Sequence, residues 1–404
     1  MKKLFSQIGP GIIVAATGIG AGDMIAAAAS GAGFGLAIAW AAVIGALLKY
    51  YLNEGIARWQ LVSGKTIVEG WNIHFPGIVN WYFIIYLFLW SFVVGGALSA
   101  ACGLAANAIF PQLTVLSWGV IHALLAIVIV LFSNYNFLEI IMKFFIALMF
   151  LVIVITAILS VSDWSALGSS LLSFEIPSGS SKFVLGVIGG VGGSVTLLNY
   201  GYWIKQKGWN GADKLKRSRT DLIVAYVITG LFGVAVMIIS AGLKPDVLQG
   251  SKMILAMADE LEKVSGSVGR WIFLLGFWGA VFSSMIGVWQ GVPFLFNDII
   301  RQNTRYVSIN KIMGVSVPYF LFLIYIAIPP LTLLLFGKPV WVVILYSVTG
   351  AFFMPFLAML LLIMNNRIIK PQMKNSRITN IALITTLLLF LFLLVTELMD
   401  FFSF

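Results

Sequence analysis

The fold of this chain is decided by two short glycine-rich stretches, Gly18-Ile19-Gly20-Ala21-Gly22-Asp23 and Gly189-Gly190-Val191-Gly192-Gly193-Ser194. Each lies near the centre of a long apolar segment. A glycine costs a helix interior up to about 1 kcal/mol relative to alanine, so three or four of them within six residues predict a place where the helix unwinds. The alternative is close packing of helices on small residues. Polar side chains follow directly on each stretch, and we therefore interpret both as breaks in long helices.

The composition identifies the environment of these helices. Hydrophobic residues make up 60% of the 404 residues and charged residues 10%, whereas soluble proteins carry about 25% charged residues. A chain this apolar cannot cover a water-facing surface, which excludes a soluble enzyme, a disordered protein and a nucleic-acid-binding domain despite the net charge of +10. One cysteine and two histidines exclude a disulfide framework and the usual zinc sites. We expect an integral membrane protein with the lipid bilayer as its main partner.

Eleven apolar segments are long enough to cross about 30 Å of hydrocarbon as helices. Together they predict an all-α polytopic protein with one transmembrane domain over residues 1–404. The first segment is too long for a cleavable signal peptide, so we expect it to remain in the mature chain. The expected spans are 8–34, 36–61, 80–103, 114–132, 137–160, 182–204, 220–242, 269–297, 312–336, 341–364 and 379–400.

The positive charges predict the orientation. A cytoplasmic N-terminus and an external C-terminus place 19 of the 25 Lys and Arg residues on the inner side, as the positive-inside rule requires. The basic run from Lys205 to Arg219 then acts as a topology determinant and not as a nucleic-acid patch. We expect a bacterial inner membrane and a monomer. The six outer residues are Lys182, Lys244, Lys252, Lys263, Arg270 and Lys338.

The positions of the two breaks predict the architecture. They fall in spans one and six, which correspond to each other if residues 8–160 and 182–364 form two five-span repeats and 379–400 is an extra helix. Paired interrupted helices at matching places indicate an inverted-repeat secondary transporter with its substrate site at the membrane centre. The sequence shows neither a pair of nucleophile and base nor a cofactor motif, so nothing in it indicates an enzyme.

Motifs outside the breaks resemble the Nramp (natural resistance-associated macrophage protein) family of metal-ion transporters. The resemblance covers most of the chain and implies the fold of the leucine transporter. The matching residues are Gly9-Pro10-Gly11, Gly31-Ala32-Gly33-Phe34-Gly35, Arg58, Val62-Ser63-Gly64-Lys65, Glu69, Ser283-Ser284, Gly287 and Pro355-Phe356.

At the breaks the sequence departs from this family. The family's Asp-Pro-Gly-Asn falls on residues 20–23, so Gly20 replaces the liganding aspartate and a carboxylate, Asp23, stands where the family has asparagine. The family's Met-Pro-His-Asn falls on residues 193–196, so Gly193 replaces the thioether ligand. A glutamine of the family falls on Ser347. The resemblance therefore implies a retained scaffold with altered substrate chemistry.

Asp23 is the one acid well inside an expected span. A charge at that depth costs about 2.5–3.5 kcal/mol on insertion scales, so we predict that Asp23 binds substrate, metal or a coupling ion. The alternative is that it caps the second half of the broken helix.

Oxygen donors close to the breaks predict the rest of the site. Such donors suit hard cations, namely magnesium, calcium, manganese or sodium. For the serines, helix packing is the alternative. The candidates are the backbone of Gly18, Gly20, Gly189 and Gly193, the side chains of Ser194, Thr196, Asn199, Ser283 and Ser284, and Ser347.

The remaining charges are expected to be structural. Glu54 and Arg58 stand one helical turn apart and predict an ion pair with Lys49 nearby. Four acids close to span ends are expected to be interfacial: Glu139, Asp221, Asp298 and Glu397.

Two functions follow from these residues. The first is a secondary transporter that moves a metal cation, and in particular a hard divalent ion, by alternating access. The alternative is a carrier of the same fold for a small organic solute, coupled to sodium or protons. No cofactor is expected, and the coupling ion, H⁺ or Na⁺, stays open. A membrane enzyme or scaffold is disfavoured.

Overall fold

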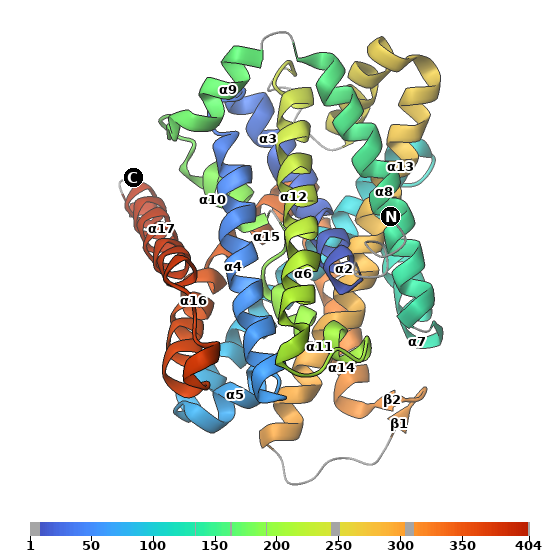
Figure 1. Cartoon of the computed structure of the whole chain (residues 1–404). Helices are drawn as coiled ribbons and strands as arrows, with labels where there is room; N and C mark the ends of the chain where they lie inside the picture. The colour runs from blue at the N-terminus through green and yellow to red at the C-terminus, as the bar shows by residue number, and fades with distance from the viewer. Residues whose placement is uncertain are drawn as a thin grey trace.

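The computed structural model describes residues 9–133, 135–161, 164–190, 192–243, 251–303 and 311–402. This part of the chain is almost entirely helical, and its long helices form one bundle (Figure 1). The two strands, β1 (Lys311–Ile312) and β2 (Val315–Ser316), form a short antiparallel hairpin at one end of the bundle. The predicted all-α architecture is confirmed.

The described residues of the first half of the chain form eight helices. Pro10 begins the first of them, at a position where its missing N–H costs nothing. Thr66 and Glu69 begin α5 with a reciprocal capping box. The helices are α2 (Pro10–Gly18), α3 (Ala21–Phe34), α4 (Trp40–Ser63), α5 (Ile67–His74), α6 (Gly77–Ile109), α7 (Val115–Phe132), α8 (Tyr135–Ser160) and α9 (Trp164–Ser173).

The second half contains the remaining helices. The longest, α13, consists of two helices that meet at Gly266, where φ is 68°. The helices are α10 (Ser181–Gly190), η1 (Val195–Leu198), α11 (Asn199–Gln206), η2 (Ala212–Lys214), α12 (Leu215–Ser240), α13 (Ser251–Asn303), α14 (Val317–Ala327), η4 (Pro329–Phe336), α15 (Pro339–Ala351), α16 (Phe353–Ile363), η5 (Met364–Ile368), η6 (Pro371–Met373) and α17 (Arg377–Phe402).

Within the described residues, nine helices are long and apolar enough to cross a membrane, and they correspond to expected spans three to eleven. The first expected span differs because it is divided into the short helices α2 and α3. The second, α4, is long enough but contains Lys49, Glu54 and Arg58, which lower its hydropathy. The count of eleven spans therefore stays a prediction.

The two broken helices lie in the interior of the bundle. All of α2 except Ile12 is buried, and α10 is buried from Val184 to Gly190. In contrast, α17 lies at one edge of the bundle, against α16 and α4 (Figure 1). The site predicted at the breaks is therefore enclosed by the other helices.

Candidate functional site

The two breaks lie at the predicted positions and touch each other. Helix α2 ends at Gly18 and α3 begins at Ala21, while α10 ends at Gly190 and the next helical turn begins at Val195. A Cβ atom on Gly18 would lie 2.6 Å from the carbonyl carbon of Gly192 and 2.9 Å from the backbone nitrogen of Gly193. No side chain fits between the two backbones, so this contact requires glycine.

The break after α10 changes the partners of two carbonyl groups. In a regular helix the amides of Gly193 and Leu197 would donate to the carbonyls four residues earlier, those of Gly189 and Gly193. Here Gly193 N–H donates to Gly190 at 2.9 Å and Leu197 N–H donates to Ser194 at 3.1 Å. Gly192 and Gly193 have φ values of 74° and 80°, a conformation that favours glycine.

Lys49 takes over both carbonyls. Its side chain extends from α4, is fully buried, and its Nζ donates to the Gly189 oxygen at 2.7 Å and to the Gly193 oxygen. The sequence prediction associated Lys49 with the Glu54–Arg58 pair and missed this contact. Hydrophobic periodicity shows that a lysine lies in an apolar helix. It does not show which backbone carbonyls the ammonium group of that lysine contacts.

The break after α2 is closed from α13. The Ser284 hydroxyl donates to the carbonyl of Thr17 at 2.7 Å, so it satisfies one of the last carbonyls of α2. A Cβ atom on Gly20 would overlap this hydroxyl. Ser283 behaves differently, because its hydroxyl donates to Ala280 within α13 at 2.9 Å. The structure thus brings Ser284 to the break, whereas the side chain of Ser283 bonds to its own helix.

Two polar side chains after the second break are buried without a hydrogen bond. Ser194 and Asn199 are each about 1% exposed, and among the described residues neither the Ser194 hydroxyl nor either end of the Asn199 amide has a partner. Such groups cost roughly 1–3 kcal/mol each, so they need a reason. Ser194 faces Gly350 of α15, and Asn199 faces Gly291 of α13.

Three further predicted residues adjoin the second break. A Cβ atom on Gly193 would overlap the hydroxyl of Thr196, which is buried. A Cβ atom on Gly189 would lie 2.5 Å from the carbonyl oxygen of Ser347. Ser347 therefore meets the break through its backbone, while its hydroxyl donates to Val343 at 3.2 Å.

Asp23 lies in the first turn of α3, whose N-cap residue is Gly20. The side chain of Asp23 is outside the described part of the structure, as is that of Glu397. Both predictions for Asp23, ligand and helix cap, stay predictions.

Two acids expected at the interface are in fact buried. Asp221 is fully buried and accepts hydrogen bonds from the amides of Gly9 at 2.9 Å and Gly11 at 2.6 Å, so it anchors the N-terminus of α2. Glu139 is 4% exposed and pairs with Lys143 at 2.6 Å and Lys207 at 2.7 Å. Lys143 lies one turn along the same helix as Glu139, whereas Lys207 and the amides of Gly9 and Gly11 come from distant segments that the sequence alone does not bring together.

Glu54 forms the predicted ion pair with Arg58 at 2.6 Å, and Arg219 from α12 adds a second contact at 2.8 Å. Because the Arg58 guanidinium also donates to the carbonyls of Met373 and Lys374, this pair connects three segments. Its role is structural.

A polar cavity of about 400 Å³ lies where α5, α11 and α13 meet. Asp298, the third acid expected at the interface, lines it and accepts from Thr66 at 2.7 Å and Tyr202 at 2.5 Å. Since Tyr202 follows Asn199 by three residues in α11, the cavity begins about one helical turn beyond Asn199. The other lining residues are Glu69, Lys205, Phe294, Asn297, Arg301 and Gln302.

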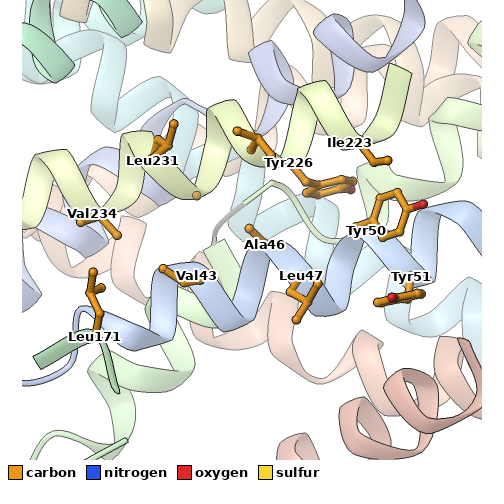
Figure 2. Close-up of a pocket in the computed structure, with 12 residues that line it drawn as sticks. Val43, Ala46, Leu47, Tyr50, Tyr51, Leu171, Ile223, Tyr226, Leu231 and Val234 are labelled. Carbon is orange, nitrogen blue, oxygen red and sulfur yellow. The ribbon is translucent and has the colours of Figure 1, made fainter. Parts of the chain in front are cut away.

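A larger cavity, of about 530 Å³, is an apolar groove between α4 and α12 (Figure 2). Val43 and Leu47 line one wall, Leu231 and Val234 line the other, and Leu171 of α9 closes one end. Three tyrosines, Tyr50, Tyr51 and Tyr226, supply the polar atoms of the groove, and it contains no carboxylate. Within the described residues no three His, Cys, Asp or Glu side chains come together as a metal cluster. Among those residues, the oxygen donors near the breaks are backbone carbonyls, hydroxyls and an amide.

Comparisons with known proteins agree with the family resemblance and the fold described above. A sequence model of the natural resistance-associated macrophage protein-like (Nramp) family matches residues 11–400. No curated protein sequence matches the chain.

Solved structures share the fold. The Eremococcus coleocola manganese transporter in complex with an aromatic bis-isothiourea substituted compound has a TM-score of 0.76 at 16% identity, over 97% of this chain and 86% of that chain. A mutant of that transporter gives the same TM-score and identity over 99% and 88%. MhsT in complex with L-phenylalanine has a TM-score of 0.60 at 16% identity, over 96% and 97%. The predicted fold class is confirmed.

Proposed function

Because the chain belongs to the Nramp, or natural resistance-associated macrophage protein-like, family, we propose that it carries a hard divalent metal cation such as manganese across a membrane by alternating access. The family makes it an integral membrane protein and a secondary transporter of metal cations. The finer points, which are the ion, the ligands, the coupling and the orientation, are our proposal.

The observation that carries the proposal is the contact of two unwound backbones beside unpartnered oxygen donors. Gly18 touches Gly192, and the Ser194 hydroxyl and the Asn199 amide lack partners among the described residues. Oxygen donors prefer hard cations, and no thioether stands at Gly193 to favour soft ones. We propose that Asp23 supplies the negative charge of this site and that the Asn199 oxygen is its nearest neutral ligand.

The mechanism follows from the enclosure of the site. A cation at the breaks is surrounded by helices, so it reaches one side only when part of the bundle moves. The polar cavity at Asp298 begins one turn beyond Asn199 and offers carboxylates, Asp298 and Glu69, along an inner path. We propose this cavity as the cytoplasmic vestibule of the carrier.

The alternative substrate, a small organic solute, has weaker support. The same-fold structure that contains L-phenylalanine has a TM-score of 0.60, compared with 0.76 for the manganese transporter, and it gives no reason to set the family aside. The missing thioether and histidine of the family's sixth helix indicate a changed ion preference within metal transport.

The proposal also includes the orientation of the chain in the membrane, the type of membrane and the oligomeric state. We propose a monomer in a bacterial inner membrane with a cytoplasmic N-terminus and an external C-terminus, because 19 of the 25 Lys and Arg residues then face the cytoplasm. Two five-span repeats, 8–160 and 182–364, with the extra helix 379–400, describe its internal organisation. The coupling ion is H⁺ or Na⁺.

Uptake of Mn²⁺ into proteoliposomes tests the proposal. We expect saturable uptake that Mg²⁺ or Ca²⁺ inhibits more strongly than Cd²⁺, because the ligands are oxygens. Asp23→Asn is expected to abolish uptake or to remove its dependence on the coupling ion, while the protein still folds. Ser283→Ala is the matched control, since that hydroxyl bonds only within its own helix turn. Uptake by Asp23→Asn at the wild-type rate would leave Asp23 as a helix cap, and strong Cd²⁺ transport would contradict the oxygen site.

A further inference from the structure

Lys49 brings the terminal nitrogen of its side chain to the second break. It lies in the middle of α4, its side chain is fully buried, and its ammonium group donates to the carbonyls of Gly189 and Gly193. Neither carbonyl receives the amide that it would receive in a continuous helix, because the chain tightens to 3₁₀-type hydrogen bonds there. The two oxygens therefore converge on a cation.

The position of this ammonium group has an electrostatic basis. Gly189 belongs to the last turn of α10, and the C-terminal carbonyls of a helix carry partial negative charge that favours a cation. In carriers with interrupted helices, unwound carbonyls and half-helix C-termini are also the groups that coordinate alkali ions. The Lys49 ammonium thus stands where such an ion would be bound.

We propose that Lys49 is a tethered cation that replaces a mobile monovalent cation at the carbonyl end of α10. The transporter then needs no alkali ion at this place. The ammonium group also repels a second cation close by, so it confines the substrate metal to the side of the breaks that contains Gly20 and Asn199. This inference deepens the proposed function by assigning a specificity-determining residue to the same site, and it rests on that function only for the location of the substrate.

Removal of the charge provides the test. Lys49→Met keeps the length and most of the volume of the side chain, Lys49→Gln keeps a donor without the charge, and Lys49→Arg keeps the charge. The measurement is the apparent Tm of the purified protein in NaCl, KCl or choline chloride at equal ionic strength. Lys143→Met is the matched control, because it removes a lysine of another membrane helix and leaves Glu139 paired with Lys207.

We expect Lys49→Met and Lys49→Gln to gain a saturable stabilisation of about 2–4 °C by an alkali ion relative to choline. Wild type, Lys49→Arg and Lys143→Met should show none. An alkali response of Lys49→Met equal to that of wild type would overturn the proposal. If Lys49→Met yields no folded protein in choline, its recovery in sodium or potassium becomes the outcome, and failure of both salts to recover it also counts against the proposal.

A second measurement separates this inference from the proposed function. Mn²⁺ uptake by Lys49→Met should depend on the alkali ion by about 10-fold, equivalent to about 1.4 kcal/mol of coupling. Wild-type uptake should be the same in choline, so of the two coupling ions left open this inference selects H⁺. If wild type transports no Mn²⁺, the proposed function fails, but the Tm comparison still decides the role of Lys49.

Discussion

Gly18 is the residue at which the two broken helices touch, and a methyl group has no space there. Its Cβ atom would lie 2.6 Å from two backbone atoms of Gly192, which cannot rotate away as a side chain could. We expect Gly18→Ala to destabilise the protein by about 1–3 kcal/mol through overpacking, and to reduce Mn²⁺ uptake more than its loss of folded protein explains. Apparent Tm and uptake per folded molecule measure the two effects.

Gly33 in α3 is the matched control, because a Cβ atom there meets nothing within 4 Å. Gly33→Ala is expected to leave uptake unchanged and to stabilise its helix by up to about 1 kcal/mol. Equal losses of uptake in both variants would show that the contact of the breaks is unimportant.

Replacing Asn199 by alanine tests whether this residue is a ligand or a packing residue, because the two roles predict different changes in the stability of the protein. Both ends of its buried amide lack partners among the described residues, so a purely structural Asn199 would be replaced by alanine with little cost or with a gain in stability. We expect Asn199→Ala to retain its Tm in the absence of metal, but to lose the stabilisation by Mn²⁺ that wild type shows and to raise the KM for uptake. Unchanged KM and unchanged Mn²⁺ stabilisation would remove Asn199 from the proposed ligands.

Single residues also show what the sequence could predict, although a ligand role for Ser194, Thr196 and Asn199 stays a prediction. Ser194, Thr196 and Asn199 were predicted because they follow the glycines that unwind the helix, a relation within six or seven residues of chain. Lys49 and Asp221 were missed because their partners are backbone groups about 140 and 210 residues away. Nothing local in α4 or α12 specifies such a partner.

At the scale of elements, α2 is a helix of nine residues that is held at both ends. Asp221 of α12 receives the amides of Gly9 and Gly11 at its N-terminus, and Ser284 of α13 donates to the Thr17 carbonyl near its C-terminus. Helices this short are marginal alone, so we infer that these anchors fix its position in the bundle.

The N-terminal anchor is open to a direct test. Asp221→Asn keeps the shape of the side chain but removes its charge and replaces one of the two acceptor oxygens by an NH₂ donor, so one of the two amides also loses its acceptor. We expect maleimide labelling of a cysteine at position 12, which is partly buried, to accelerate by about 10-fold, equivalent to about 1.4 kcal/mol. Cys102 is buried and contributes little background. Thr220→Val is the control, since the Thr220 hydroxyl donates only to Lys216 of its own helix. An unchanged labelling rate would show that the two amides hold α2 without the charge.

Elements were predicted best where their cause is local. The glycine clusters located both breaks to within a few residues, because backbone conformation at a glycine depends mainly on its neighbours in sequence. Span two could not be predicted from local sequence. Its charged residues are stabilised by distant groups, namely by α12, by the Met373–Lys374 segment and by the break after α10.

At the scale of the whole molecule, the orientation in the membrane stays a prediction that three exposed positions can test. Asn210→Cys and Gln372→Cys should react with an impermeant thiol reagent only from the cytoplasmic side, and Gly168→Cys only from outside. Labelling of intact cells and of inverted vesicles provides the two measurements. Reaction of any of the three from the opposite side would contradict the eleven-span topology.

The meeting of the two breaks is made of main-chain atoms, and this has a consequence for how such carriers evolve. Gly18 touches Gly192 and Gly193 without any side chain between them, so this contact depends on the glycines and not on the chemistry of nearby side chains. Side chains that flank the contact, such as Ser194 and Asn199, can therefore change identity while the glycines and the architecture are retained. In a carrier built this way, a few substitutions are enough to change the transported ion, and the arrangement of the helices stays the same.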